Sequence, residues 1–325
     1  ITNGAAESGG GIHLDQSSPS LYDLTVSQNT ASSTGGGIYC YDQSSPILKN
    51  SSVVNNSAGQ HAGGIRCWDD SNIKLNNVLI ANNMASQFGG GMQCRNSSPT
   101  LMNVTIINNN ADDFGGGIYL RSDSNPIIVN SIVWGNTPQN IYFRAGAEGG
   151  SQGNITFSYS DLQGGQDSIV TNENGTVTWG TGNIDINPRF INAENDDYHL
   201  LASSQLINAG HPDSTDSDGT VADIGAYPYL NSYSGPTWYI TESGNDTTAT
   251  GASDDPFRSI QAGINFSSDA DSVTVAAGTY VENINFRGRN IKVVGADRET
   301  TFIDGNENGS VVTFKNPNGE FNHQY

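Results

Sequence analysis

Aromatic and cationic residues recur at a nearly constant interval along the first part of the chain. One recurring position holds His13, Tyr39, Arg66, Gln93 and Tyr119, and the position two residues later holds Asp15, Tyr41, Trp68, Arg95 and Arg121. Flat aromatic faces stack on sugar rings, and guanidinium groups match the geometry of carboxylate or sulfate. If both positions point outward, they predict a strip that binds an acidic polysaccharide.

The same strip has a purely structural interpretation. Ladders of aromatic and arginine side chains stabilise an exposed sheet through cross-strand stacking and cation–π contacts. A lyase would also need a positioned base and a cation, and a hydrolase would need paired carboxylates. The acids beside the strip stand at turn positions, where aspartate is common. We therefore assign no catalytic residue and expect a non-catalytic protein, with a polysaccharide lyase or glycoside hydrolase as the alternative.

A second group of candidate ligands lies in an acidic segment that ends in Gly219. Its carboxylates are Asp213, Asp216, Asp218 and Asp223. Alternating carboxylates in a tight turn are typical of calcium loops, because hard cations need several oxygen ligands. The segment departs from the EF-hand pattern, in which a bidentate Glu would stand where this chain has Gly225. The alternative is a solvated acidic turn, and we expect no cofactor other than calcium.

Three sequence markers recur at the same interval, and they indicate the repeating elements on which the strip lies. Glycine blocks end before Ile12, Ile38, Ile65, Met92 and Ile118, which lie 26, 27, 27 and 26 residues apart. A serine-containing turn marker follows each block, and an asparagine recurs at Asn29, Asn56, Asn83, Asn109 and Asn136. Such self-similarity is the signature of a solenoid. We predict stacked coils of about 26 residues over residues 9–136.

The segments between the markers predict strands rather than helices. They are short, alternating and rich in β-branched residues, and Gly, Asn, Ser and Pro bound them. Stacked coils of this kind form long parallel sheets, so we predict an all-β fold, a right-handed parallel β-helix. The column that begins with Ile12 should face the core, as should a second column made of Leu14, Cys40, Cys67, Cys94 and Leu120. The cysteines are therefore interpreted as buried apolar side chains.

Composition excludes several functions. The 325 residues include 13 Lys plus Arg and 33 Asp plus Glu, which gives a net charge of −20. This balance argues against a nucleic-acid partner and an anionic membrane surface. No apolar run reaches the roughly 18 residues that span a bilayer, so we expect no membrane insertion. The composition fits an extracellular or cell-surface protein, and the first residues suggest a processed or excerpted piece of a longer polypeptide.

The repeats carry a family resemblance. Gly35-Gly36-Gly37-Ile38 and Ser97-Ser98-Pro99 with the strand that follows resemble repeats of pectin-lyase-like β-helices and of bacterial surface proteins. Residues 183–229, with Asp197-Tyr198-His199-Leu200 among their motifs, resemble the choice-of-anchor segment that closes many such helices. The resemblance implies three parts: coils over residues 1–182, a closing segment over 183–235, and an opening segment over 236–325.

The third part resembles the start of pectin-lyase-like domains, in which a short helix plugs the first coil. Asp255 before Pro256 suits a helix N-terminus, and Phe257, Ile260 and Ile264 form one apolar face. Strands are expected afterwards over residues 284–286, 291–294, 302–303 and 311–314. The fold should therefore contain one short capping α-helix.

The order of these parts is inverted, because the closing segment precedes the opening one. In the resembling family, a stretch like residues 309–314 is commonly followed by one like residues 1–4. We therefore expect a unit of a tandem array, or a subunit that continues the helix of the next copy head to tail. The expected function is structural, adhesive or filament-forming. The alternative is an arbitrary fragment of a two-domain surface protein.

Overall fold

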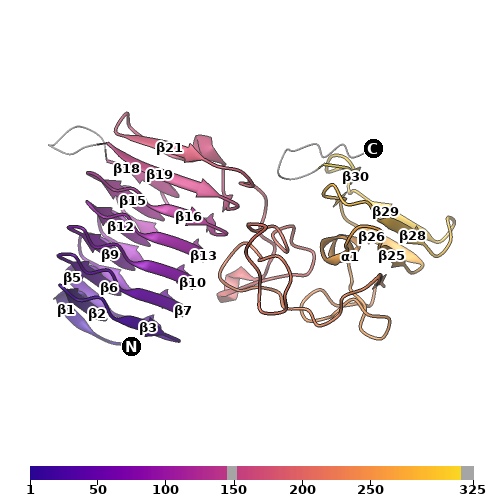
Figure 1. Cartoon of the computed structure of the whole chain (residues 1–325), viewed down its shortest axis with the longest axis horizontal. Helices are drawn as coiled ribbons and strands as arrows, with labels where there is room; N and C mark the ends of the chain where they lie inside the picture. Colours follow the sequence, from indigo (N-terminus) through magenta and orange to yellow (C-terminus); the bar gives the residue numbers. More distant parts are fainter. Residues whose placement is uncertain (145–151, 316–325) are drawn as a thin grey trace. The chain divides into compact units, whose positions relative to one another are not determined.

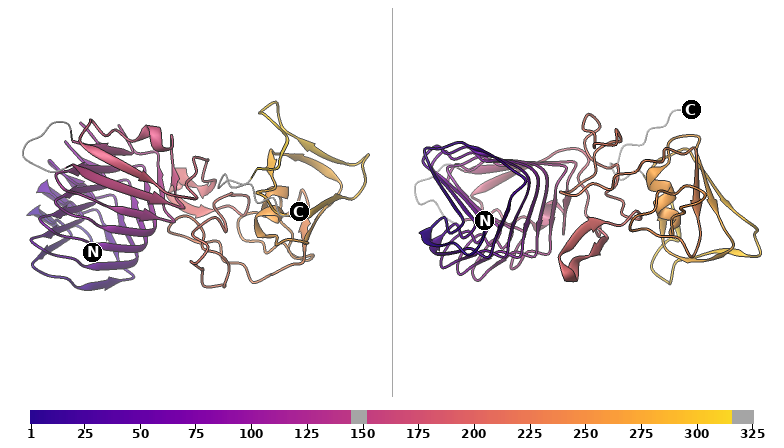
Figure 2. Two further views of the ribbon diagram at one scale, coloured as in Figure 1. Left: turned by 45° about the horizontal axis from the view of Figure 1, so that its top comes forward. Right: turned by 90° about the horizontal axis from the view of Figure 1, so that it is seen from below.

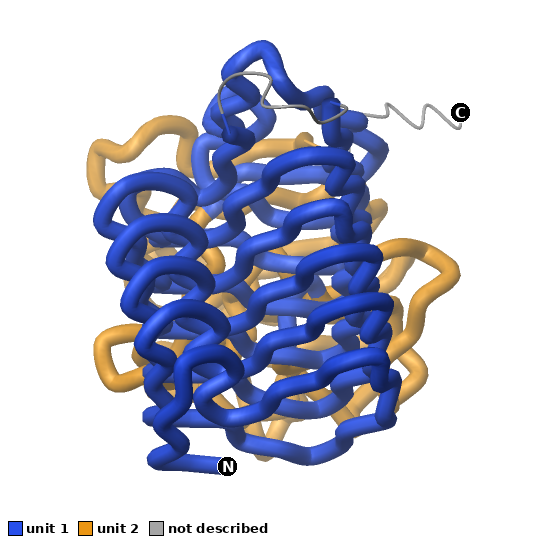
Figure 3. The backbone as a smooth tube through the Cα atoms, turned by 90° about the vertical axis from the view of Figure 1, so that its left-hand side faces the viewer, with its two compact units in different colours: residues 1–186, 224–226 blue, residues 187–223, 227–325 orange. Residues whose placement is uncertain are grey.

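The computed structural model describes residues 1–144 and 152–315 (Figure 1). The chain divides into two compact units, which Figure 3 distinguishes by colour. The first unit comprises residues 1–186 and 224–226, and the second comprises residues 187–223 and 227–325. This division differs from the three expected parts, whose boundaries at 182 and 235 stay predictions.

The first unit is a parallel β-helix whose stacked coils are seen end-on in Figure 2. One sheet contains β2 (Ile12–Asp15), β6 (Ile38–Tyr41), β9 (Ile65–Trp68), β12 (Met92–Arg95), β15 (Ile118–Arg121) and β18 (Ile141–Phe143). A second contains β3 (Ser20–Tyr22), β4 (Thr25–Ser27), β7 (Ile47–Val54), β10 (Lys74–Ala81), β13 (Thr100–Ile107), β16 (Ile127–Val129), β17 (Ile132–Trp134), β19 (Gly153–Ser158), β20 (Asp161–Leu162) and β21 (Gly175–Trp179). The third contains β1 (Ala5–Ser8), β5 (Thr30–Thr34), β8 (Ser57–Ala58), β11 (Met84–Ala85) and β14 (Asn110–Ala111). A short 3₁₀ helix, η1, covers Gln166–Ser168.

The strand register confirms the two inward columns. Ile65 pairs with Ile38 on one side and with Met92 on the other, and Cys67 pairs with Cys40 and Cys94 in the same way. All six side chains have no exposed surface. The three cysteines are free thiols in the core, so they fill space as small apolar groups.

Buried asparagines and close-packed glycines fix each coil against the next. Asn83 donates from Nδ2 to the carbonyl oxygen of Val53 and to Oδ1 of Asn109, at 2.8 and 2.9 Å, and its own Oδ1 accepts the backbone N–H of Asn56. A Cβ atom at Gly36 would lie 2.3 Å from the carbonyl oxygen of Ser57. Only glycine fits that close backbone approach.

The second unit contains shorter parallel sheets and the single α-helix of the described residues. The strands are β22 (Phe190–Asn192), β23 (Asp197–Leu200), β24 (Thr237–Ile240), β25 (Ser272–Val275), β26 (Gly278–Val281), β27 (Ile284–Asn285), β28 (Lys292–Gly295), β29 (Thr301–Asp304) and β30 (Val312–Thr313), and a 3₁₀ helix, η2, covers Ala193–Asn195. The pairs β24–β25–β28, β26–β29 and β27–β30 are parallel, whereas β22 and β23 are antiparallel. The expected strands after residue 283 are therefore present, within one or two residues at each end.

Helix α1 (Ile260–Phe266) confirms the predicted capping helix but not its start. The helix begins after Ser259, whose hydroxyl accepts the backbone N–H of Ala262, so Asp255 and Pro256 lie in the preceding turn. A serine N-cap satisfies an amide that the helix itself leaves without a partner. Ile260 and Ile264 are fully buried, as the apolar face predicts.

A buried polar network joins the segment around residues 202–208 to α1. Asn265, with no exposed surface, donates from Nδ2 to the carbonyl oxygens of Ala202 and Ser204 at 2.9 and 2.8 Å. Its Oδ1 accepts from Gln261 and from the buried guanidinium of Arg287. These contacts place most of the predicted closing segment in the second unit.

Candidate functional site

The position that begins with His13 lies on the outer face of its strands, but after His13 it is not open to solvent. Tyr39, Arg66, Gln93 and Tyr119 are 8%, 3%, 0% and 3% exposed. The expectation of an exposed strip is therefore wrong for this position, which we call the covered column. In this arrangement Tyr39, Arg66 and Tyr119 have almost no surface left for contact with a sugar.

A ladder of loop residues covers this column. His61, Phe88 and Phe114 form successive parallel bridges, and their rings stack at 5.3 and 6.1 Å between centroids. Phe88 also stacks on Tyr119 of the covered column at 4.8 Å. The interval between these loop residues matches the repeat, so a search for recurring aromatics in the loops would have indicated the ladder.

The neighbouring position, which we call the exposed column, keeps access to solvent. Tyr41 is 36% exposed, and Trp68, Arg95 and Arg121 are partly exposed. The register places Trp68, Arg95 and Arg121 side by side on consecutive strands. These four residues, with Asp15 at the end of the column, are the part of the predicted strip that a ligand can reach.

One cation–π contact links the two columns, and a second lies within the exposed column. The guanidinium carbon of Arg66 lies 3.9 Å from the ring centroid of Trp68, and that of Arg95 lies 4.5 Å from it. These are the contacts that the structural interpretation of the strip expects. Both interpretations remain compatible with the geometry, because Tyr41 and the arginines still have exposed surface.

The covered column is electrostatically unusual. Burial is the main cause that lowers the pKa of Arg66 to about 9; the charges of Arg121 and Arg95 act in the same direction, and Tyr39 acts against it. Burial also lowers the pKa of His61 to about 4, with Arg66 acting in the same direction, so His61 is neutral at pH 7. Among the described residues, Nε of Arg66 and both amide atoms of Gln93 are buried without a hydrogen-bond partner. This region carries positive charge and unsatisfied polar groups within an acidic chain.

The acidic segment of the second unit uses its carboxylates to hold a turn. Asp216 accepts the backbone N–H of Asp223 at 2.8 Å, and Asp218 accepts the N–H and hydroxyl of Thr220 and the N–H of Asn231. Asp213 is exposed. Within residues 1–144 and 152–315, no group of three His, Cys, Asp or Glu side chains is placed to hold a metal ion. Calcium binding by these four aspartates stays a prediction.

Burial governs the ionisation of two of these carboxyl groups. It raises the pKa of Asp223 to about 8, assisted by the charge of Asp216, although the N–H groups of Asn208 and Tyr229 act in the opposite direction. Burial likewise raises the pKa of Asp216 to about 6, with Asp218 adding to the shift. Asp223 is therefore largely protonated at pH 7.

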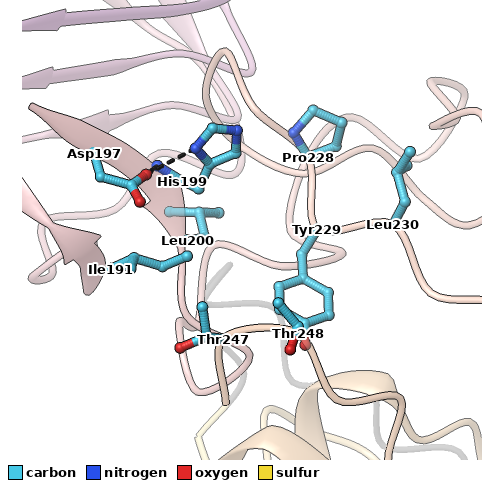
Figure 4. Close-up of a pocket in the computed structure, with 9 residues that line it drawn as sticks. All are labelled: Ile191, Asp197, His199, Leu200, Pro228, Tyr229, Leu230, Thr247 and Thr248. Atoms are coloured by element: carbon cyan, nitrogen blue, oxygen red, sulfur yellow. Dashed lines mark hydrogen bonds and ion pairs between the residues drawn. The ribbon is translucent and has the colours of Figure 1, made fainter. Parts of the chain in front are cut away.

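Sequence reasoning missed a pocket in the second unit, which Figure 4 shows. Asp197 and His199 contribute to it from β23, and residues 228–230 and 247–248 complete its wall. Alternation along a strand places residues 197 and 199 on one face, with buried Tyr198 and Leu200 on the other. That alternation was the available signal, but nothing in the sequence indicates which distant loops meet this face.

No described helix is long and apolar enough to cross a membrane.

A model of the right-handed beta helix region family matches residues 10–200, and a model of a protein family of unknown function (DUF1565) matches residues 242–321. The first match covers more than half of the 325 residues and bears out the predicted right-handed parallel β-helix. Comparisons with curated proteins and with solved structures gave no match.

Proposed function

The chain belongs to the right-handed β-helix family, and we propose that it is a non-catalytic, extracellular structural module that stacks coil on coil with further copies, head to tail. One observation carries this proposal. Within the described residues, β28 and β29 are edge strands that pair on one side only. Unpaired strand edges are templates for pairing with another chain.

The side chains at this edge support coil stacking. Val293 is only partly buried, although it pairs with the fully buried Val273. Ile303 is likewise partly buried, and it pairs with the buried Tyr280. Inward-facing apolar residues thus continue into the last described coil, where nothing among the described residues covers them. A further coil in the same register would bury them.

The first unit has an edge with matching chemistry. Ile12 on β2 and Leu21 on β3 face the core but are only partly buried, whereas their partners Ile38 and Leu48 have no exposed surface. Both edges therefore present parallel strands with apolar inward residues. Contacts between two different edges are heterologous and generate open filaments or closed rings.

A charged substitution on the inward face tests this function. The change Val293→Lys places a charge where a stacked coil would bury it, and inward-pointing charges are an established block to edge pairing. Val294→Lys is the matched control, because Val294 is 50% exposed on the other face of the same strand. The measurement is light scattering across a concentration series, with electron microscopy of the same samples.

We expect oligomers or fibres from the native protein and from Val294→Lys, and a strong reduction for Val293→Lys. Native material that stays monomeric at every concentration would contradict the proposal. Equal assembly of the two variants would also contradict it, since the edge would then not be the contact.

The exposed column supports binding of an acidic polysaccharide as a second function. Arg95 and Arg121 are adjacent on consecutive strands, and the column gathers this positive charge in a chain with a net charge of −20. Their guanidinium groups suit uronate or sulfate groups spaced along a polymer, and Tyr41 offers an exposed ring.

Binding of polygalacturonate to the native protein and to Arg95→Ala and Arg121→Ala tests this second function. We expect each arginine variant to bind several-fold more weakly, whereas Lys49→Ala, which removes an exposed cation from another sheet, should bind normally. Equal binding by all variants would remove the column from consideration. Release of unsaturated or reducing ends would favour the lyase or hydrolase alternative instead.

A further inference from the structure

The pocket of the second unit has a volume of about 460 Å³ and lies outside the two surfaces considered above. Its polar groups come from Asp197, His199, Thr247 and Thr248. Figure 4 shows the Asp197–His199 pair on one side of the pocket and the two threonines across from it, beside the ring of Tyr229.

The Asp197–His199 pair has a defined hydrogen-bonding pattern. Oδ1 of Asp197 lies 2.8 Å from Nδ1 of His199 and accepts the backbone N–H of the same residue at 3.2 Å. A carboxylate accepts, so Nδ1 carries the proton and Nε2 of the neutral ring is an acceptor. Burial alone would raise the pKa of Asp197, but the hydrogen bonds from His199 outweigh it and lower that pKa. The pair therefore presents Oδ2 of Asp197 as an acceptor, together with Nε2 in the neutral form of the His199 ring.

Neighbouring contacts hold these groups in place. The His199 ring stacks on Tyr227, with centroids 4.4 Å apart and planes 17° apart. The Tyr229 hydroxyl donates to the carbonyl oxygen of Ala249 at 2.6 Å, which fixes the ring that borders the pocket. Thr248 accepts from the side-chain amide of Asn245 at 3.1 Å. Groups fixed before binding lose little conformational entropy when a ligand arrives.

The rest of the lining selects the chemical class of ligand. Ile191 and Pro228 supply apolar surface beside the Tyr229 ring. None of the described residues that line the pocket is Lys or Arg, and its one formal charge is that of Asp197. An anion is therefore disfavoured, whereas a neutral ligand with several hydroxyl donors and one apolar face is complementary.

We propose that this pocket binds a neutral sugar residue or similar polyol, whose hydroxyl groups donate to Asp197 and His199 and whose apolar face lies on Tyr229. The inference goes beyond the proposed functions. It concerns a different unit, and it requires the opposite charge preference from the arginine column.

Titration calorimetry with the methyl glycosides of glucose, galactose and mannose tests this inference on the full chain. We expect saturable binding of at least one glycoside. Asp197→Asn and Thr248→Val should each weaken it, the former about tenfold, because a hydrogen bond to a charged group is lost. Asp254→Asn is the matched control, since it removes an exposed carboxylate of the same unit outside the pocket lining.

The folding of each variant is checked by its thermal unfolding, and His199→Gln provides a second variant that retains an acceptor near Nε2. Retained binding in His199→Gln together with a loss in Asp197→Asn supports the proposed contacts. The absence of saturable binding by all three glycosides would overturn the proposal, as would binding that both pocket variants leave unchanged. Polygalacturonate binding by Asp197→Asn separates this outcome from failure of the arginine column.

Discussion

The hydrogen bonds that stabilise the two units of this chain join residues at very different separations along the sequence. In the first unit, the hydrogen bonds of Asn83 connect residues 26 to 30 positions apart, and the same pattern recurs at Asn56 and Asn109. In the second unit, Asn265 joins residues 61 and 63 positions away, and Arg287 reaches Ile207 over 80 positions. A repeated short-range pattern distributes stability along the axis, whereas single long-range contacts concentrate it at a few residues.

The largest expected effect is therefore at Asn265. Its replacement by Ala removes two donor contacts and leaves the buried Arg287 guanidinium without one acceptor. A lost hydrogen bond to a charged group costs about 1.5–3 kcal/mol, and each neutral one costs about 1 kcal/mol. We expect the second unit to lose about 4 kcal/mol of unfolding free energy, measured by denaturant unfolding.

Asn290→Ala is the control in the same unit, because that side chain is exposed and should change the stability by less than about 0.5 kcal/mol. Hydrogen exchange should locate the loss of protection in segment 202–208 and in α1. Equal losses for the two variants would refute the idea that a few residues hold this unit together.

A smaller effect is expected from Asn83→Ala in the first unit. The change removes the contacts to Val53 and Asn109 and leaves the buried N–H and the Nδ2 of Asn56 without the acceptor that Asn83 supplies. At about 0.5–1 kcal/mol for each of these four, the loss is about 3 kcal/mol. Because each coil contacts only its neighbours, hydrogen exchange should rise in β8 and β11 and remain unchanged in β17.

Asn76→Ala tests the same coil at an outward, partly exposed position of β10 and should change stability by less than about 0.5 kcal/mol. If the loss at Asn83 extended to distant coils, the stability of the first unit would not be a sum of local terms. The contrast between the units would then be one of sequence pattern alone.

Ionisation provides the next contrast. A carboxyl group whose pKa is raised on folding binds more protons in the folded state, so stability is full below the unfolded pKa and falls as pH rises towards the folded pKa. Asp223, raised to about 8, therefore destabilises the second unit as pH increases from about 4 to 8. Between pH 6 and 8 we expect a loss of about 2 kcal/mol.

Asp216, raised to about 6, adds to the loss at the lower end of this range. In the first unit, His61 changes stability with pH in the opposite direction. Because its pKa is lowered to about 4, folding becomes more favourable as pH rises from 4 to 6.5. Peptide-resolved hydrogen exchange at several pH values measures both. A gain in protection of residues 208–231 between pH 6 and 8 would contradict the expected sign.

The repeat explains why the sequence predicted so much of the first unit and so little of the second. Cys40, Cys67 and Cys94 could be assigned to one buried column, because an error in register at one coil would break the pattern at all others. In the second unit, residues such as Asp197 and Thr248 occur once, so no pattern indicates that they share a pocket. Helix α1 was predicted from its apolar residues, but its start depended on which residue caps it.

The site was harder to predict than the fold even where the repeat is clear. Periodicity identifies the side chains that share a column, and it assigned Arg66 and Tyr119 to an outer face. It does not say what lies above that face. The covering residues Phe88 and Phe114 belong to a different part of the coil, so their approach depends on how the loop folds back on the strand.

The smallest expected effect, of opposite sign, concerns this covered column. Gln93 has no exposed surface, and neither of its amide atoms has a hydrogen-bond partner among the described residues. Burying an unsatisfied amide is costly, and an apolar side chain of similar shape avoids that cost. Gln93→Met should therefore stabilise the first unit by about 1 kcal/mol in denaturant unfolding, whereas Met92→Gln, on the core side of the same strand, should destabilise it. A destabilised Gln93→Met would show instead that the amide is satisfied in solution, by ordered water or by a ligand. The covered column would then be a polar site rather than a second, imperfect core between loop and sheet.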